Sequence, residues 1–173
     1  ELSDDTEKLK NGDIYILNSG GNFTTADLLK LARQKSPIAI IADTKEKKII
    51  EDWCIENIRS SEQSWKKTYF VRSMKTLSGF LASSFYLNPS SKITISAVTG
   101  TNGKTTVVNA AAKAFAECEG ACASLGTLGL IIYKKVLNNV VENQILEFGM
   151  TTPSAVSLQR YLNFILMRNL EEE

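Results

Sequence analysis

The sequence contains no histidine among its 173 residues. Histidine is the usual general base near neutral pH and a common nitrogen ligand of zinc, so its absence excludes serine triads and histidine-bound metal sites from this chain. Cysteine is scarce as well. Cys54, Cys118 and Cys122 are odd in number and show no CxxC spacing. This pattern is typical of reduced thiols in a cytosolic protein and argues against a secreted disulfide framework.

Long apolar runs and an excess of one charge are also missing. No stretch approaches the roughly 18 apolar residues of a membrane helix, and the polar start is unlike a signal peptide, so we expect a cytoplasmic protein. Twenty basic and nineteen acidic side chains leave a formal net charge of +1. No overall field would therefore attract nucleic acid or a membrane surface, and any phosphate binding must be local. Because the chain begins at Glu1 and ends in three glutamates after a helical pattern, we expect a fragment of a longer protein.

The first half shows the pattern of an α/β fold. Short apolar, β-rich runs predict buried strands at residues 14–17, 38–42 and 68–71. Apolar side chains three and four residues apart predict helices over residues 24–33, 45–59 and 73–87, with the aromatic side chains of the third helix in the core. Strands that alternate with helices imply a parallel sheet.

A helix breaker and small polar residues at 88–92 mark a domain boundary, which gives domains at residues 1–91 and 92–173. The most apolar strand is predicted at residues 93–98, followed by a glycine-rich turn and an alanine-rich helix at 104–119. Further strands are predicted at residues 121–125, 130–133 and 145–148, and a last helix at 154–170.

The glycine-rich turn carries the chemistry. It consists of Gly100, Thr101, Asn102, Gly103, Lys104, Thr105 and Thr106. A strand, a glycine-rich loop and a helix in this order are the context of a phosphate-binding loop, in which glycines let backbone N–H groups point at phosphate oxygens. Lys104 would neutralise the terminal phosphates as the catalytic lysine, and Thr105 would ligate Mg²⁺. The loop therefore predicts binding of ATP and Mg²⁺.

The loop departs from the strict pattern GxxxxGK[ST], because Val98 stands where that pattern has its first glycine. It is a shorter form, in which two residues separate Gly100 from Gly103. The alternative is a glycine-rich turn that caps a helix beside a chance lysine, and the order of the surrounding elements favours phosphate binding.

The segment 100–106 resembles the signature of the Mur ligases and the folylpolyglutamate synthases. Segments 85–90, 125–129, 151–153 and 158–160, in this order, resemble the MurE branch of the Mur ligases, the UDP-N-acetylmuramoyl-tripeptide synthetases. The resemblance covers nearly the whole chain, strongly from about residue 80 to residue 160. It implies a small N-terminal α/β domain that binds a UDP-sugar nucleotide, followed by the first part of a central P-loop α/β domain that binds ATP.

The resemblance also implies positions for the substrate. Segment 5–16 is similar to the family's DSRxVxxGDxFVA opening, although Thr6 replaces its serine and Glu7 its arginine. By position, the nucleotide end of the substrate would lie at Thr6, Gly21, Asn22 and Phe23; for each, an ordinary turn residue is the alternative. Thr151 and Thr152 would contact the muramyl part, while their alternative role is helix capping, since Pro153 is suited to a first helical turn.

The implied activity is that of an ATP-dependent carboxylate–amine ligase in peptidoglycan precursor synthesis. The D-glutamate carboxylate of UDP-N-acetylmuramoyl-L-alanyl-D-glutamate takes the γ-phosphoryl of ATP, and the amine of a diamino acid attacks the resulting acyl phosphate. In the family, further metal ligands, a carbamylated lysine and the amino-acid-binding domain lie beyond the position of residue 173, so we expect these residues alone to be inactive. Two alternatives stay open: a non-catalytic MurE-like binding or structural partner of plastid type, and a folylpolyglutamate synthase-like ligase.

Overall fold

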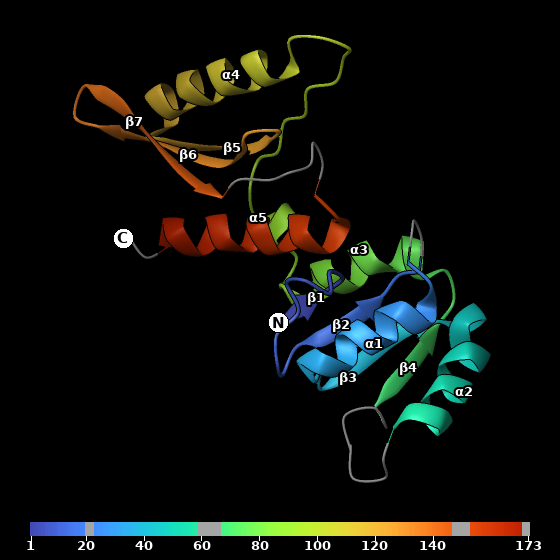
Figure 1. Ribbon diagram of the computed structural model, residues 1–173. Helices are drawn as coiled ribbons and strands as arrows, with labels where there is room; N and C mark the ends of the chain where they lie inside the picture. Colours follow the sequence, from blue (N-terminus) through green and yellow to red (C-terminus); the bar gives the residue numbers. More distant parts are fainter. Residues whose placement is uncertain (20–22, 59–66, 147–152, 171–173) are drawn as a thin grey trace. The chain divides into compact units, whose positions relative to one another are not determined.

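The computed structural model describes residues 1–19, 23–58, 67–146 and 153–170 (Figure 1). Contacts divide the chain into two compact units. The first contains Glu1–Asn88 and Ser154–Arg160, and the second contains Pro89–Pro153 and Tyr161–Glu173. The first unit has a parallel sheet, the second has an antiparallel sheet, and both carry helices. The predicted α/β fold class is therefore confirmed.

A four-stranded parallel sheet organises the first unit, with the strand order β1-β2-β3-β4. Its strands are β1 (Leu2–Ser3), β2 (Ile14–Leu17), β3 (Ala39–Asp43) and β4 (Thr68–Val71). Its helices are α1 (Thr25–Lys35), α2 (Lys47–Asn57), which follows the 3-10 turn η1 (Thr44–Glu46), and α3 (Met74–Phe85). The predicted strands at β2 and β4 have the predicted bounds, whereas β3 is shifted by one residue. The two-residue strand β1 is too short to show a sequence pattern.

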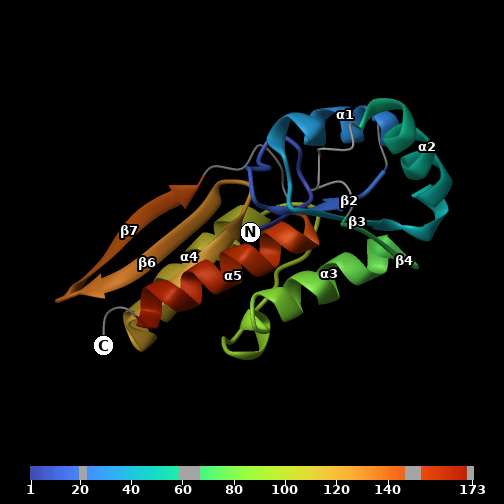
Figure 2. The ribbon, with the colours of Figure 1, turned by 90° about the horizontal axis from the view of Figure 1, so that it is seen from below.

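Both faces of this sheet are buried, which explains why its strands read as continuous apolar runs. On one face, Tyr15, Leu17, Ile40 and Ala42 pack with side chains from α1 and α2 such as Leu29. On the other face, Ile16 packs with Leu2, Met74, Ala82 and Val156. Figure 2 shows α1 and α2 on one side of the strands and α3 on the other.

Helix α3 corrects one prediction about the core. Phe80 is 71% exposed and Phe85 is 45% exposed, so the prediction that the aromatic side chains of this helix lie in the core is wrong for these two; Tyr86, directly after the helix, is partly buried and packs against the core. The buried residues are Met74, Ser78 and Ala82, which recur four apart. Small side chains at two of these positions let the helix approach the sheet closely, and Phe80 falls outside that face.

The second unit is built on the antiparallel strands β5 (Ala121–Gly126), β6 (Gly129–Val136) and β7 (Asn139–Leu146), in the order β5-β6-β7. Helix α4 (Lys104–Glu119), with its predicted bounds, packs on one face through Ala112 and Ala116, which contact Ile131 and Tyr133. The strand predicted at residues 145–148 begins earlier, at Asn139, because residues 139–144 continue the pairing with β6 toward the hairpin turn. Its last two predicted residues, 147 and 148, lie outside the described residues.

The strand predicted at residues 93–98 is wrong. After the 3-10 turn η3 (Pro89–Ser91), the chain runs without helix or strand to the start of α4 (Figure 1). Ile95 is 55% exposed and Val98 is 39% exposed. A strand exists only where a neighbouring strand pairs with it, and the described part of the chain contains no strand paired with this segment. The apolar, β-branched sequence of this segment favours a strand, but a strand does not form without a partner to pair with.

The last helix, α5 (Ala155–Leu170), starts one residue later than predicted. Across the described ranges, no helix is both long enough and apolar enough to cross a membrane.

Candidate functional site

The seven residues of the predicted phosphate-binding loop lie together at the N-terminal end of α4. Gly100 has φ 148° and Gly103 has φ 75°, two backbone conformations that favour glycine. The Lys104 ammonium donates hydrogen bonds to the carbonyl oxygens of Gly100, at 2.5 Å, and Thr101, at 3.3 Å. The lysine side chain thus folds back over the loop that precedes it, and its charge is held where the loop turns.

The start of α4 is not capped by a side chain. Gly103 is the N-cap residue and has no side chain to bond the free backbone N–H groups of the first turn. The helical ladder begins with the bond from the Val107 N–H to the Gly103 carbonyl at 2.9 Å. All residues from Gly100 to Thr106 are exposed. Open N–H groups, the positive end of a helix dipole and an ammonium group together form an arrangement suited to an anion such as a phosphate.

Three polar contacts attach α4 to its sheet. The Ser124 hydroxyl on β5, which is 5% exposed, donates to Asn109 Oδ1 at 3.2 Å. Lys113 forms an ion pair with Glu142 on β7 at 3.0 Å, and the Glu142 carboxylate raises the pKa of Lys113. The Lys135 ammonium on β6 donates to the Glu117 carbonyl at 2.8 Å. All three strands therefore contact the helix whose start carries the loop.

A second set of predicted residues lies at the carboxyl edge of the parallel sheet. Thr6 follows the end of β1, and Phe23 lies between the end of β2 and the start of α1. Adjacent parallel strands end at the same edge, which is where open α/β sheets bind ligands. The Phe23 ring is 55% exposed. Gly21 and Asn22, predicted with them, lie outside the described residues, as do Thr151 and Thr152.

Two carboxylates at this edge organise the connections, and the sequence analysis did not single them out. Asp43, the last residue of β3, accepts hydrogen bonds from the N–H groups of Lys45, at 3.0 Å, and Met74, at 2.9 Å. It thus holds the starts of two helical segments, and these bonds lower its pKa. Glu46 accepts from the Ser19 hydroxyl at 2.6 Å and from the Thr25 hydroxyl at 2.5 Å. An aspartate directly after a strand and before a helical pattern was the available signal for Asp43, whereas no local pattern marks the distant partners of Glu46.

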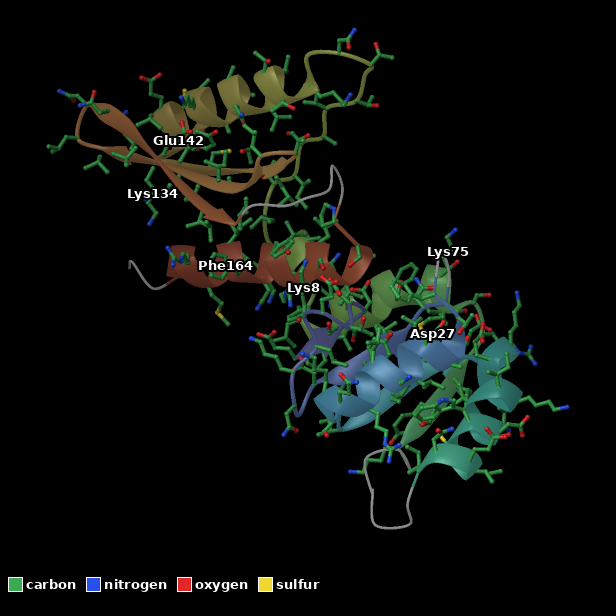
Figure 3. All side chains as sticks on the ribbon, in the orientation of Figure 1. Lys8, Asp27, Lys75, Lys134, Glu142 and Phe164 are labelled. Carbon is green, nitrogen blue, oxygen red and sulfur yellow. The ribbon has the colours of Figure 1, made fainter. Side chains whose placement is uncertain are left out.

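The start of α1 is fixed separately by Thr24 and Asp27. The Asp27 N–H donates to the Thr24 hydroxyl oxygen at 3.2 Å, and the Thr24 N–H donates to the Asp27 carboxylate at 3.1 Å. This reciprocal pair is a capping box, with Asp27 in the first helical turn (Figure 3).

The start of α5 corrects the capping alternative. The Ser154 hydroxyl accepts from the Ser157 N–H at 3.1 Å and donates to the Asp4 carboxylate at 3.0 Å. Ser154 therefore caps α5, in place of the threonine hydroxyls that the sequence offered, and the helix begins at Ala155 instead of the predicted residue 154. Burial raises the pKa of Asp4, although the hydrogen bond from Ser154 acts in the opposite direction.

Comparison with known proteins shows which proteins the chain is similar to. Residues 98–171 match the Mur ligase middle domain. A UDP-N-acetylmuramoyl-L-alanyl-D-glutamate–2,6-diaminopimelate ligase of Chlamydia caviae is 30% identical over 161 residues, which are 93% of this chain and 28% of that protein. The chain is related to the Mur ligases. A ligase of the same name from Buchnera aphidicola is 30% identical over 173 residues, which cover 98% of this chain and 31% of that protein. The corresponding Chlamydia muridarum ligase is 38% identical over 101 residues, 58% of this chain and 19% of that protein.

The relation to the Mur ligases confirms the predicted resemblance, and the chain spans less than a third of the length of these relatives. The structure places Gly100 to Gly103 in the turn before α4 and Lys104 to Thr106 at the start of that helix, but without the predicted strand in front of the turn. Among the residues that the structure describes, no group of three or more cysteine, aspartate or glutamate side chains could hold a metal ion. The Thr105 hydroxyl stays the predicted magnesium ligand of this segment.

Proposed function

We propose that the protein is an ATP-dependent carboxylate–amine ligase of the Mur type. Its substrate would be UDP-N-acetylmuramoyl-L-alanyl-D-glutamate, to which it would join a diamino acid. The observation that carries this proposal is the loop at the start of α4, which contains two positive-φ glycines, holds the Lys104 ammonium on its carbonyl oxygens and precedes an uncapped helix. The names of the relatives support the choice of the two substrates.

The loop residues fit a nucleotide triphosphate bound with Mg²⁺. Lys104 now has two carbonyl oxygens as acceptors, and phosphate oxygens would replace them as stronger, charged acceptors. The free N–H groups of the first turn of α4 would bind further phosphate oxygens, and the Thr105 hydroxyl would hold the metal ion. Bound ATP would supply the phosphoryl group that turns an unreactive carboxylate into an acylating agent.

For the sugar nucleotide we propose two groups of residues. Thr6, Gly21, Asn22 and Phe23 would bind the nucleotide end, and Thr151 with Thr152 would bind the muramyl part. The location of Thr6 and Phe23 after neighbouring strands of the parallel sheet supports the first group. Residues 1–91 would thus form the sugar-nucleotide domain, and residues 92–173 would belong to the ATP-binding domain.

The experiment is product analysis with the protein expressed from its whole reading frame. With ATP, Mg²⁺, the UDP-N-acetylmuramoyl dipeptide and 2,6-diaminopimelate, we expect ADP and the tripeptide precursor in equal amounts. Lys104→Ala should abolish both products, because no backbone N–H can replace its charge. Lys113→Ala is the matched control, since it removes a lysine from the exposed surface of the same helix and should retain activity. A wild-type protein that binds ATP but forms no tripeptide would instead be a binding protein without this activity.

A further inference from the structure

Helix α3 carries little charge for a helix at the surface of its unit. Its exposed side chains are those of Lys75, Thr76, Phe80, Ser84 and Phe85. Lys75, at the N-terminal end, is the only charged residue of α3, which the structure describes over its whole length (Figure 3). Helices α1 and α2 of the same unit each carry several charged residues. A surface helix normally has charged residues on the side away from its core, so α3 has the composition of a helix with a further partner.

The exposed apolar groups of α3 lie on one side of the helix. Thr76, Phe80, Ser84 and Leu87 follow one another at intervals of three or four residues, so they share one face, which we call the outer face of α3. Phe80 is 71% exposed, and Leu87, just after the helix, is 70% exposed. Single exposed apolar side chains are ordinary, whereas two large ones on one uncharged face form a patch of the kind that binds another protein.

Leu87 also has a backbone conformation that glycine normally takes. The end of α3 is a Schellman motif, in which the Asn88 N–H donates to the Ser83 carbonyl at 2.7 Å and the Leu87 N–H donates to the Ser84 carbonyl at 3.1 Å. Leu87 has φ 60°, in the left-handed region that is unfavourable for a residue with a side chain. Glycine would form this helix end with less strain, so the exposed leucine points to a contact outside the helix.

We propose that the outer face of α3 is a contact between two copies of the chain, which pack as an antiparallel helix pair about a two-fold axis near Phe80. The two Phe80 rings would meet at the axis, and Leu87 of each copy would cover the first turn of the other helix. This inference goes beyond the proposed ligase activity and does not depend on its substrates.

Charge and hydrogen-bonding capacity favour a second copy in this orientation. An antiparallel pair places each Lys75 near the C-terminal end of the other helix, whose partial negative charge attracts it, whereas a parallel pair would bring the two Lys75 ammonium groups together. Thr76 would lie opposite Ser84 of the other copy, and hydroxyl groups can both donate and accept. The same surface can therefore serve both sides of a two-fold contact.

The size of the face sets the strength of the contact. A helix of 12 residues is about 18 Å long. One helix pair of this length buries less than the roughly 1,200 Å² of a standard interface, so the dimer should be weak and should form as the protein concentration rises.

The test is analytical ultracentrifugation of the protein expressed from its whole reading frame, over a range of concentrations. The wild type should show a reversible equilibrium between monomer and dimer. Phe80→Asp should weaken dimerisation at least about tenfold, because it places two like charges at the two-fold axis. Ile55→Asp is the matched control, since Ile55 is 81% exposed on α2, outside the outer face, and should leave dimerisation unchanged.

Leu87→Gly separates the contact from the stability of the fold. Glycine removes the backbone strain, so this variant should not lower Tm, yet it should weaken dimerisation severalfold. Leu137→Gly is the matched control, because Leu137 has φ 57° and is 89% exposed in the second unit. It should also keep Tm, and it should dimerise like the wild type. Unchanged dimerisation of the Leu87→Gly protein would overturn the inference.

Cysteine substitutions test the antiparallel orientation in a Cys118→Ser background, because Cys118 is exposed. Under oxidation, Thr76→Cys combined with Ser84→Cys should give a covalent dimer, and Thr76→Cys alone should not, because its two copies would lie at opposite ends of the contact. Covalent dimers of the Thr76→Cys protein alone would contradict the antiparallel pair.

Two further outcomes would overturn the inference and leave the proposed ligase intact. One is a folded Phe80→Asp protein that dimerises like the wild type. The other is a wild type that stays monomeric at all concentrations; if Phe80→Asp then lowers Tm, the outer face packs against another part of the same chain.

Discussion

Replacement of Gly103 by alanine tests whether the loop needs its unusual backbone conformation. Gly103 has φ 75°, a conformation that costs an L-residue about 1–2 kcal/mol. An added Cβ would meet no heavy atom within 4 Å, so a steric clash contributes nothing. Alanine also restricts the conformations of the unfolded chain, which stabilises the folded state by about 0.4–1 kcal/mol. We therefore expect Gly103→Ala to lower the free energy of unfolding of the second unit by about 1 kcal/mol.

The matched control is Gly126→Ala at the end of β5. A Cβ at Gly126 would also meet nothing within 4 Å, but the φ of this residue is not positive. This variant should gain about 0.4–1 kcal/mol from the restricted unfolded chain alone. The assay is native-state hydrogen exchange at buried β6 amides, which reports the opening free energy of this unit. Equal stability of the two alanine variants would refute the assigned loop conformation, because both sites offer the same space and differ in φ.

Three further substitutions test the polar groups of the first unit. Hydrogen bonds lower the pKa of Asp43 in the folded state. The Asp43 carboxylate therefore stabilises the fold fully above its unfolded pKa of about 3.9, and this stabilisation is lost as the pH falls through its folded pKa. Asp43→Asn should lower Tm at neutral pH, and the difference in Tm from the wild type should vanish near about pH 2. Burial raises the pKa of Asp4, so the contribution of Asp4 to stability is present below its unfolded pKa and is lost as the pH rises through its folded pKa. Asp4→Asn should therefore raise Tm at about pH 7 and leave Tm unchanged at about pH 3. Equal shifts of Tm at both pH values would contradict the burial effect. Thr24→Ala should lower the free energy of unfolding by about 1 kcal/mol in urea titrations, and an unchanged midpoint would show that the capping box adds nothing.

The first unit could be predicted largely from local patterns. The β2 and β4 runs are apolar on both faces because helices cover both faces of the sheet, and such runs are visible in the sequence. The start of α1 was visible in the hydroxyls and carboxylate of Thr24, Thr25 and Asp27. Helix α3 could not be predicted to the same depth, because the spacing of its aromatic side chains does not tell which face meets the sheet. Ser78 and Ala82 set that face by their small size.

The candidate site was predictable where its chemistry is contained in one short segment. The residues from Gly100 to Thr106 carry the loop, the lysine and the helix start, and the structure assembles them without help from distant residues. The strand at 93–98 was not predictable in this way, because a strand depends on partners elsewhere in the chain. Glu46 was missed for the same reason, since its partners Ser19 and Thr25 lie 27 and 21 residues away. The cytoplasmic location expected from the sequence stays a prediction.

The most direct test of the central claim is calorimetric titration of the protein with Mg-ATP. Wild type and Lys113→Ala should bind with the same affinity, because Lys113 pairs with Glu142 away from the loop. Lys104→Ala, shown to be folded by circular dichroism, should bind at least about tenfold more weakly, which is the loss of one charge-assisted contact of roughly 1.5–3 kcal/mol. Equal affinity of the folded Lys104→Ala protein and the wild type would contradict the assignment of the loop as the phosphate-binding site.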